Sequence, residues 1–253
     1  MRIQGVSYNV TDKYQLYIDR EGISYVSANG KKSLNIKFAD VGSIVPLRYC
    51  SSNQSYSILF RDYNGKNMKE EIETDVQYGN GYNNIQETKS ILIAFAESKL
   101  TSAFPDNIDF LDIQLAFNIK EKEIRLKDGT IIGAVHQVKL TDIRRVKCVG
   151  NGTLNSLLIY KKDKGGFLDA PDMRIPVNEL TLPVLEMAMV RNTGRGIDFS
   201  QGNGFDQKTS EYIVARYMNS TFFVNEDGSI TDDWHRIAYE HVHSCQSDIE
   251  ISV

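Results

Sequence analysis

The chain has few cysteines and no long apolar run. Its 253 residues contain only Cys50, Cys148 and Cys245, an odd number without paired spacing. This usage argues against a disulfide framework and for a reducing compartment. The first residues lack the apolar core of a signal peptide, and no later segment is apolar for long enough to span a bilayer. We therefore expect a cytoplasmic protein without a transmembrane segment.

Signatures of catalysis are also lacking. Cys50 and Cys148 lie in predicted strands without a neighbouring His that could act as a base. The Gly-rich runs 78–81 and 202–204 do not join a strand to a helix as phosphate-binding loops do. A sequence pI near 5.6, with few aromatic residues among the basic ones, is far from the footprint of a nucleic-acid-binding protein. We expect no enzymatic activity, no cofactor and no nucleic-acid partner.

What the chain does contain is an internal repeat. Residues 35–41 (NIKFADV) recur as residues 137–143 (QVKLTDI), and Asp40 and Asp142 are 102 residues apart. Ile44 and Val146 continue the match in the same register. A period of this length is too long for a solenoid unit and is typical of a duplicated small domain.

The repeat extends in both directions with small insertions. Upstream, Ile18 aligns with Ile119 at an offset of 101 residues. Downstream, residues 58–60 align with 158–160 at an offset of 100, and Gly65 aligns with Gly165. We therefore predict a first domain over residues 1–104, a second over 105–200 and an acidic C-terminal helical extension over 201–253.

Each copy is predicted to consist of short strands followed by one helix. Period-two alternation and frequent turn residues indicate strands from about residue 14 to 76. A helix is expected over 85–100, with Asn83 or Asn84 as its cap and Glu87 on its wet side. The second helix should begin after Thr181, acting as cap, and end at 192–194. The predicted fold class is mainly β.

The tail has no counterpart in either copy. Helical spacing of Ile213, Tyr217 and Met218 predicts a helix over 209–223, and a second helix is expected from Trp234 to about 242. Residues 120–164 carry a local charge of +6, whereas residues 197–253 carry −7. The acidic tail could fold back on the basic second copy, or either charge could meet a partner.

Short antiparallel strands closed by a C-terminal helix, in about a hundred residues and present twice, resemble the pleckstrin-homology-like superfold. The resemblance covers roughly residues 1–200 and rests on element order and the repeat alone. It implies two bent, partly open antiparallel barrels, each with its helix plugging one end. Proteins of this superfold are mostly not enzymes and bind phosphoinositide head groups, peptides or other proteins.

The basic face of the second copy is a candidate anion-binding site. In the phosphoinositide-binding branch of the superfold, basic residues on the first two strands hold phosphates. The present spacing only approximates that pattern, and Glu121 and Glu123 lie among the bases. The alternative is a solvated strand face, because interspersed charge is what surfaces normally carry. The candidate residues are Lys120, Lys122, Arg125, Lys127, Arg144, Arg145, Lys161 and Lys162.

A second candidate is a metal site near the C-terminus. His235, His241, His243 and Cys245 offer imidazole and thiolate ligands of the kind that Zn²⁺ takes. His241 and His243 would face the same side of an extended strand. No second half of a standard ligand pattern accompanies them, so incidental surface histidines are the alternative. His136, on the repeated strand, is interpreted as a partly buried sheet residue.

These observations favour a cytoplasmic binding or scaffolding protein whose partner is another protein or a peptide. Edge strands and the groove between sheet and helix are the places where such a domain would add a partner strand. The first alternative is an adaptor for anionic lipids that uses the basic second copy. The second alternative is a metal-dependent hydrolase that uses the C-terminal histidines.

Overall fold

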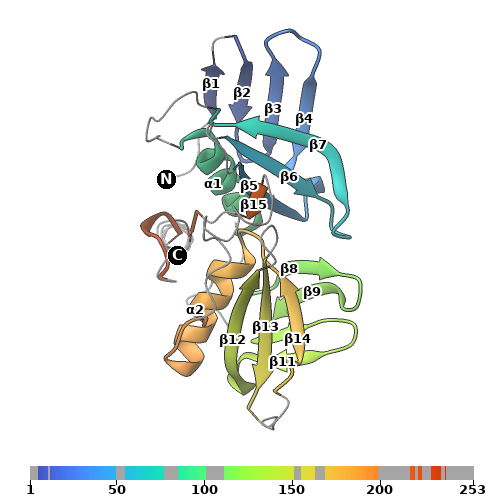
Figure 1. Cartoon of the computed structure of the whole chain (residues 1–253), viewed down its shortest axis with the longest axis vertical. Coiled ribbons are helices and arrows are strands. Elements are labelled where there is room, and N and C mark those ends of the chain that lie inside the picture. Colours follow the sequence, from blue (N-terminus) through green and yellow to red (C-terminus); the bar gives the residue numbers. More distant parts are fainter. Residues whose placement is uncertain are drawn as a thin grey trace, which may run out of the picture.

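The computed structural model describes residues 5–10, 12–49, 55–76, 85–100, 111–150, 155–162, 169–198, 217–219, 222–223, 229–234 and 237. Two similar halves lie one beyond the other along the long axis of the molecule (Figure 1). The upper half contains the elements from β1 to α1, and the lower half contains those from β8 to α2. We refer to residues 5–100 as the first copy and to residues 111–198 as the second copy.

The first copy consists of two antiparallel sheets and a helix. Strands β1 to β4 form one sheet in sequential order, and β5 to β7 form most of another. The elements are β1 (Val6–Val10), β2 (Tyr14–Ile18), β3 (Gly22–Ser27), β4 (Ser33–Lys37), the 3-10 helix η1 (Phe38–Asp40), β5 (Ser43–Tyr49), β6 (Tyr56–Arg61), β7 (Asn67–Thr74) and α1 (Glu87–Leu100).

The second copy has the same order of elements. Its two sheets contain β8 to β11 and β12 to β14. The elements are β8 (Ile113–Asn118), β9 (Lys122–Lys127), β10 (Thr130–Ile132), β11 (Gln137–Lys139), the 3-10 helix η3 (Leu140–Asp142), β12 (Ile143–Gly150), β13 (Asn155–Lys161), β14 (Met173–Pro176) and α2 (Thr181–Thr193). A last strand, β15 (Tyr217–Asn219), follows in the tail.

The repeated heptapeptide folds in the same way in both copies. It ends β4 and β11 and then forms η1 and η3, whose first residues are Phe38 and Leu140. These two side chains are each 1% exposed. The segment therefore turns the chain from one sheet to the next around a buried apolar side chain.

The two extensions of the repeat are wrong in register. Ile18 ends β2 and Ile119 follows β8, although by element order β2 corresponds to β9. The error arises because β3 and β4 have six and five residues while β10 and β11 have three each.

The downstream extension is wrong by one residue. Phe60 pairs with Ile44, and Ile159 pairs with Val146, which is equivalent to Ile44. Their offset is 99 rather than 100, and a slip of one residue exchanges the two faces of a strand.

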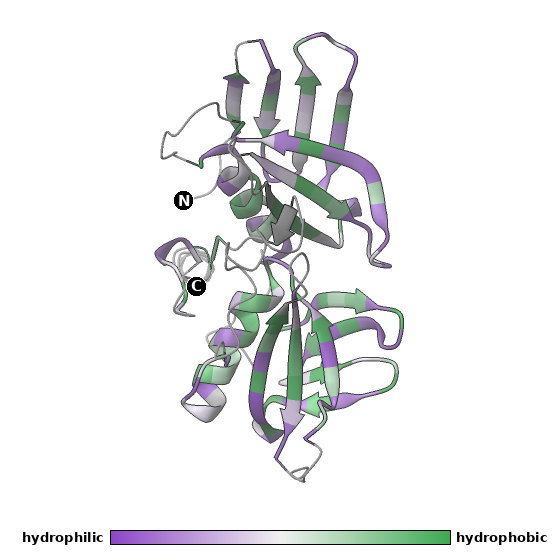
Figure 2. Ribbon diagram, in the orientation of Figure 1, coloured by the Kyte–Doolittle hydropathy of each residue, from purple (hydrophilic) through white to green (hydrophobic). Residues whose placement is uncertain are grey.

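The described part of the chain is mainly β, as predicted, in four antiparallel sheets. None of these sheets closes on itself within the described residues. Hydrophobic and hydrophilic residues alternate along several strands, as Figure 2 shows. The buried side chains of both copies form one continuous apolar cluster, which also includes Phe223 and Trp234 of the tail. Burial of this shared cluster is the main stabilising contribution.

The cap of α1 is a side chain that the sequence did not indicate. The carboxylate of Asp75, at the end of β7, accepts from the backbone N–H groups of Gln86 (3.0 Å), Glu87 (3.1 Å) and Thr88 (2.8 Å). Asn83 and Asn84, the predicted caps, lie outside the described residues. Glu87 was expected on the wet side, and this is wrong because it is 8% exposed and accepts from the backbone N–H of Asp75 (2.7 Å).

The helix α2 has a local cap. The side-chain oxygen of Asn178 accepts from the N–H groups of Leu180 and Thr181, both at 2.9 Å. Thr181 is therefore the first helical residue rather than the cap, although its hydroxyl accepts from the N–H of Asn178 (2.8 Å). Gly194 ends the helix as predicted, with φ of 67° and its N–H bound to Val190.

The predicted helix over 209–223 is wrong, because residues 217–219 form β15 on the edge of β5. A sheet edge offers unpaired N–H and C=O groups, and pairing with these groups outweighs the helical spacing of the apolar residues. The second tail helix is described only in part. Residues 232–234 and 237 are helical, so that this helix begins at Asp232, earlier than expected.

Candidate functional site: the outer edge of β5

The outer edge of β5 is occupied by a strand from the tail of the same chain. β5 pairs with β6 on one side and with β15 on the other, so the sheet order is β15-β5-β6-β7. β15 runs antiparallel to β5 and pairs Tyr217 with Tyr49, Met218 with Arg48 and Asn219 with Leu47. Figure 1 shows this late strand, in orange-red, beside the much earlier β5. The described pairing stops before Pro46, which has no N–H to donate.

The corresponding edge of the second copy is filled differently. β12 follows η3 as β5 follows η1. Asp198, just beyond α2, makes a single parallel bridge to Lys147. Its N–H donates to Val146 O (2.7 Å), and its carbonyl accepts from the N–H of Cys148 (3.1 Å). Both copies therefore receive a backbone segment on the same edge, and among the described residues only the first receives an antiparallel strand.

Aromatic side chains anchor the tail close to β15. Phe223 and Trp234 are fully buried, and their ring centroids are 5.2 Å apart. The indole N–H of Trp234 donates to the sulfur of Met187 on α2 (3.0 Å). Phe222 packs edge-on against Tyr56 of β6, with the centroids 5.4 Å apart. The tail thus contacts both copies.

Two polar contacts complete the tail anchor. Lys89 on α1 forms an ion pair with Asp233, so this acidic tail residue contacts the first copy. The carboxyl of Glu179, 4% exposed, accepts from the N–H of Phe222 (3.3 Å). Burial raises the pKa of Glu179 to about 8, and the hydrogen bond from Phe222 only partly opposes this. At neutral pH the Glu179 carboxyl is therefore mostly protonated beneath the tail.

The predicted anion-binding residues fall on two different sheets. Lys122, Arg125 and Lys127 belong to β9, whereas Arg144 and Arg145 belong to β12. Arg125 donates to Asp112 (2.6 Å) and Glu123 (2.7 Å). The hydrogen bonds that Arg125 donates to these carboxylates raise its pKa. Its charge is therefore already compensated. Lys120 lies in the exposed turn before β9.

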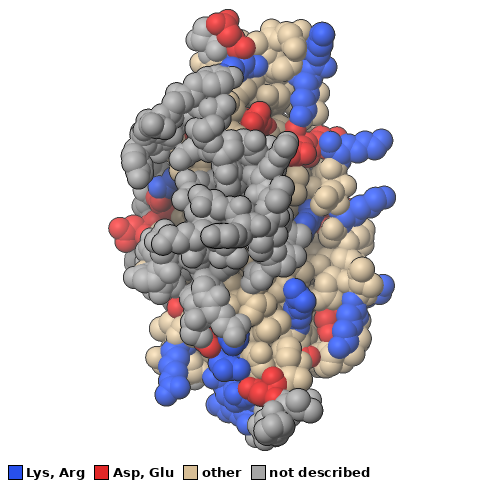
Figure 3. All heavy atoms as spheres, in the orientation of Figure 1, with Lys and Arg blue, Asp and Glu red and all other residues tan. Residues whose placement is uncertain are grey.

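The arginines of β12 form a separate group. A β-bulge at the start of β12 interrupts the register between Ile143 and Arg145. The guanidinium carbons of Arg144 and Arg145 lie 5.3 and 4.5 Å from the ring centroid of Tyr160. Both guanidiniums pair with Asp169. Lys161 ends β13 nearby and Lys162 is exposed after it. Figure 3 shows basic side chains gathered at this lower end of the molecule, with acidic ones beside them.

The predicted metal ligands His235, His241, His243 and Cys245 lie outside the described residues. Within the described ranges, no group of three or more His, Cys, Asp or Glu side chains could hold a metal ion. His136 is partly buried, as expected, and its Nδ1 lies 2.5 Å from the carboxylate of Glu121. Cys148 is buried, and burial raises the pKa of its thiol to about 12, which leaves it unreactive.

Sequence reasoning missed β15 and its aromatic anchors. The available signal was local: Tyr217 belongs to a run with Ile213 and Val214, and residues 221–224 read TFFV. β-branched and aromatic residues of this kind favour strands over helices. No protein-family model matches the chain, and no curated protein matches it either. Within the part of the chain that the structure describes, no helix is long and apolar enough to cross a membrane.

Proposed function

We propose that the protein binds a partner polypeptide by strand addition at the outer edge of β5, and that β15 is the resident occupant of this edge. The observation that carries the proposal is the antiparallel pairing of residues 217–219 with residues 47–49. An edge that accepts a segment distant in sequence offers the main-chain groups that a partner strand would use.

The contacts of the tail support an exchange of β15. Three residues make only a few backbone hydrogen bonds, each worth about 1 kcal/mol net. Truncating a buried Trp or Phe costs about 3–5 kcal/mol. The aromatic anchor therefore holds the tail more strongly than β15 does. β15 can leave the edge while Trp234 stays in place.

The resident strand also sets the affinity that a partner needs. Because β15 is tethered, it competes at an effective concentration on the order of millimolar. A free peptide binds the intact protein weakly under this competition. A partner therefore binds tightly only if it makes side-chain contacts beyond those of the three residues of β15, or if β15 has already left the edge.

We further propose that each copy is a pleckstrin-homology-like domain in a cytoplasmic binding or scaffolding protein. Seven strands in two sheets, followed by a helix, occur in both copies in the same order. This order supports the resemblance, and it supports the division near residue 104. Fold alone leaves the partner open, so the functional argument rests on the β5 edge.

A peptide added in trans tests the proposal. In the full-length variant Met218→Pro/Asn219→Pro, at least one N–H that faces β5 is removed, because successive N–H groups of a strand point to opposite sides. A fluorescent peptide with the sequence of residues 213–223 should bind this variant at least tenfold more tightly than the wild type. The same peptide with the two prolines should not bind. Equal affinity for wild type and variant, or no binding to either, would contradict strand addition.

Anionic lipid is the second candidate partner. The observation in its favour is that four basic residues lie together at one end of the second copy. Arg144 and Arg145 lie at the β-bulge of β12, next to Lys161 and Lys162. Against it, Asp169 already pairs with both guanidiniums. Binding to anionic and neutral liposomes over a salt series, with Arg144→Glu/Arg145→Glu as the comparison, separates the two candidates. Salt-sensitive binding that the variant loses would favour the lipid.

A further inference from the structure

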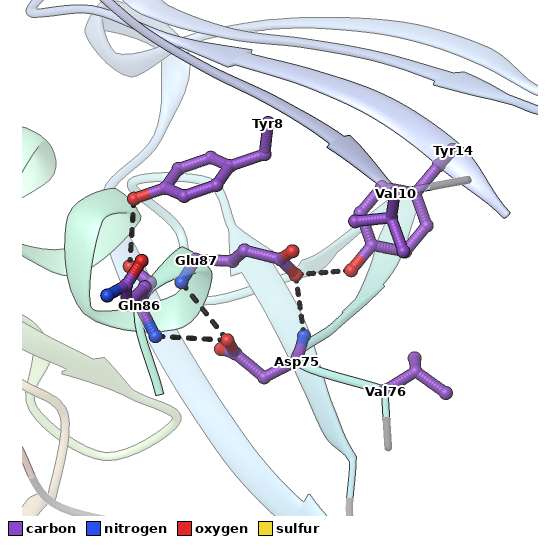
Figure 4. Close-up of a pocket in the computed structure, with 7 residues that line it drawn as sticks. All are labelled: Tyr8, Val10, Tyr14, Asp75, Val76, Gln86 and Glu87. Carbon is purple, nitrogen blue, oxygen red and sulfur yellow. Dashed lines mark hydrogen bonds between the residues drawn. The ribbon is translucent and has the colours of Figure 1, made fainter. Parts of the chain in front are cut away.

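A cavity in the first copy lies where the β1–β2 hairpin meets the start of α1. Its volume is about 170 Å³. Figure 4 shows its side chains, which come from two strands, the end of β7 and the first turn of the helix. They are Tyr8, Val10, Tyr14, Asp75, Val76, Gln86 and Glu87.

One oxygen of the Glu87 carboxylate takes no part in the hydrogen bonds at the start of α1. Glu87 is 8% exposed. Its Oε2 accepts from the N–H of Asp75 (2.7 Å) and from the hydroxyl of Tyr14. Its other oxygen makes no hydrogen bond to the residues drawn in Figure 4. Because Glu87 lines the cavity, a buried carboxylate presents an unused acceptor to this space.

The walls suit a cation. Tyr8 and Tyr14 line the cavity with Val10 and Val76, and aromatic faces attract cations. Burial, together with the hydrogen bond and charge of Glu87, raises the pKa of Tyr14, which therefore remains a neutral donor. The hydroxyl of Tyr8 is held by Ser90 (2.7 Å). The ammonium of Lys13 donates to the carbonyl oxygen of Val76 (2.9 Å), a residue that lines the cavity.

The same contacts exclude other ligand classes. An anion would need the free N–H groups of the helix start, but Asp75 already accepts from those of Gln86, Glu87 and Thr88. A guanidinium prefers both oxygens of a carboxylate, and only one is unused here. Ca²⁺ and Mg²⁺ need several oxygen ligands. A primary ammonium group needs one strong acceptor and tolerates aromatic walls.

We propose that this cavity binds a primary ammonium group, with Glu87 Oε1 as its acceptor. The group could belong to a lysine side chain of a polypeptide or to a small free amine. The proposal is independent of strand addition at β5, because β5 contributes no residue to the cavity.

Titration of the full-length protein tests the proposal by NMR, with the amide signals of residues 75 and 87 as the readout. n-Butylammonium chloride should bind saturably and at least tenfold more tightly than n-butanol, its neutral analogue. Nα-acetyl-lysine methylamide should bind similarly if the cavity accepts a lysine side chain. Binding of n-butylammonium alone would assign the site to small amines. No shift with either cation, or equal shifts with n-butanol, would overturn the proposal.

Two variants separate the charge of Glu87 from its structural role. Glu87→Gln retains an acceptor for Asp75 and Tyr14 but removes the negative charge, so affinity for n-butylammonium should fall at least tenfold. Glu123→Gln is the matched control, because it removes a carboxylate from β9 of the second copy and none from the cavity, so affinity should change less than threefold. Unchanged affinity in Glu87→Gln would contradict the assigned acceptor.

Discussion

The two copies share their strand order but differ at the same two places. On the β5 edge the first copy holds a three-residue antiparallel strand, whereas on the β12 edge the described part of the chain places one residue, Asp198. The helix α1 is capped by a charged side chain from the end of β7, whereas α2 is capped locally by Asn178. The two copies therefore share their sheets and their 3-10 helices. They differ in the segment that occupies a sheet edge and in the residue that caps the helix.

The largest loss of stability is expected at the aromatic contacts between the tail and the two copies. Trp234→Ala should lower the free energy of unfolding by about 3–5 kcal/mol, because it empties a fully buried site against Phe223 and Met187. Urea denaturation measures this change. Ile119→Ala is the control, since Ile119 is 87% exposed and its loss should cost less than about 0.5 kcal/mol. Equal effects of the two variants would contradict the anchor.

The buried carboxyl under the tail should make stability depend on pH. The pKa of Glu179 is raised to about 8, so the folded state holds a proton that the unfolded state releases near pH 4.3. The stability that Glu179 contributes through this proton is fully present below the unfolded pKa and is lost as the pH rises through 8. Glu179→Gln removes the dependence. Between pH 5 and pH 8, wild type should lose about 3 kcal/mol relative to this variant. Parallel stability curves in denaturation at several pH values would refute the assignment.

The two helix caps should differ in strength. Asp75→Ala removes a carboxylate that accepts from three backbone N–H groups and the Thr88 hydroxyl, and should cost about 2 kcal/mol. Asn178→Ala removes an acceptor of two N–H groups and should cost about 1 kcal/mol. Thermal and urea unfolding compare the variants. A larger cost for Asn178→Ala would reverse the ranking of the caps.

A smaller effect on stability is expected at the turn before β9 in the second copy. Glu121 accepts from the N–H groups of Val135 (3.1 Å) and His136 (3.0 Å). Burial opposes ionisation, but the hydrogen bonds from His136 and Val135 outweigh it and lower the pKa of Glu121. Glu121→Gln should cost about 1 kcal/mol at pH 7. The difference should shrink as the pH falls through the lowered pKa, because the stabilising carboxylate is then protonated in both states.

Periodicity and turn residues were sufficient to predict the mainly β architecture and both helices. They were insufficient for strand register, since β10 and β11 are shorter than β3 and β4 and the copies therefore have no constant offset. The Asp75 cap and the β15–β5 pairing could not be predicted locally. Each joins residues that are distant in sequence, and in β15 tertiary pairing overrides a helical spacing.

Hydrogen exchange at the amides of residues 47–49 tests the central proposal most directly. In the wild type, those amides of β5 that face β15 should be protected. They should exchange at least tenfold faster in Met218→Pro/Asn219→Pro and regain protection when the peptide of residues 213–223 is added. Exchange that is identical in wild type and variant, or that the peptide leaves unchanged, would contradict a strand-addition edge at β5.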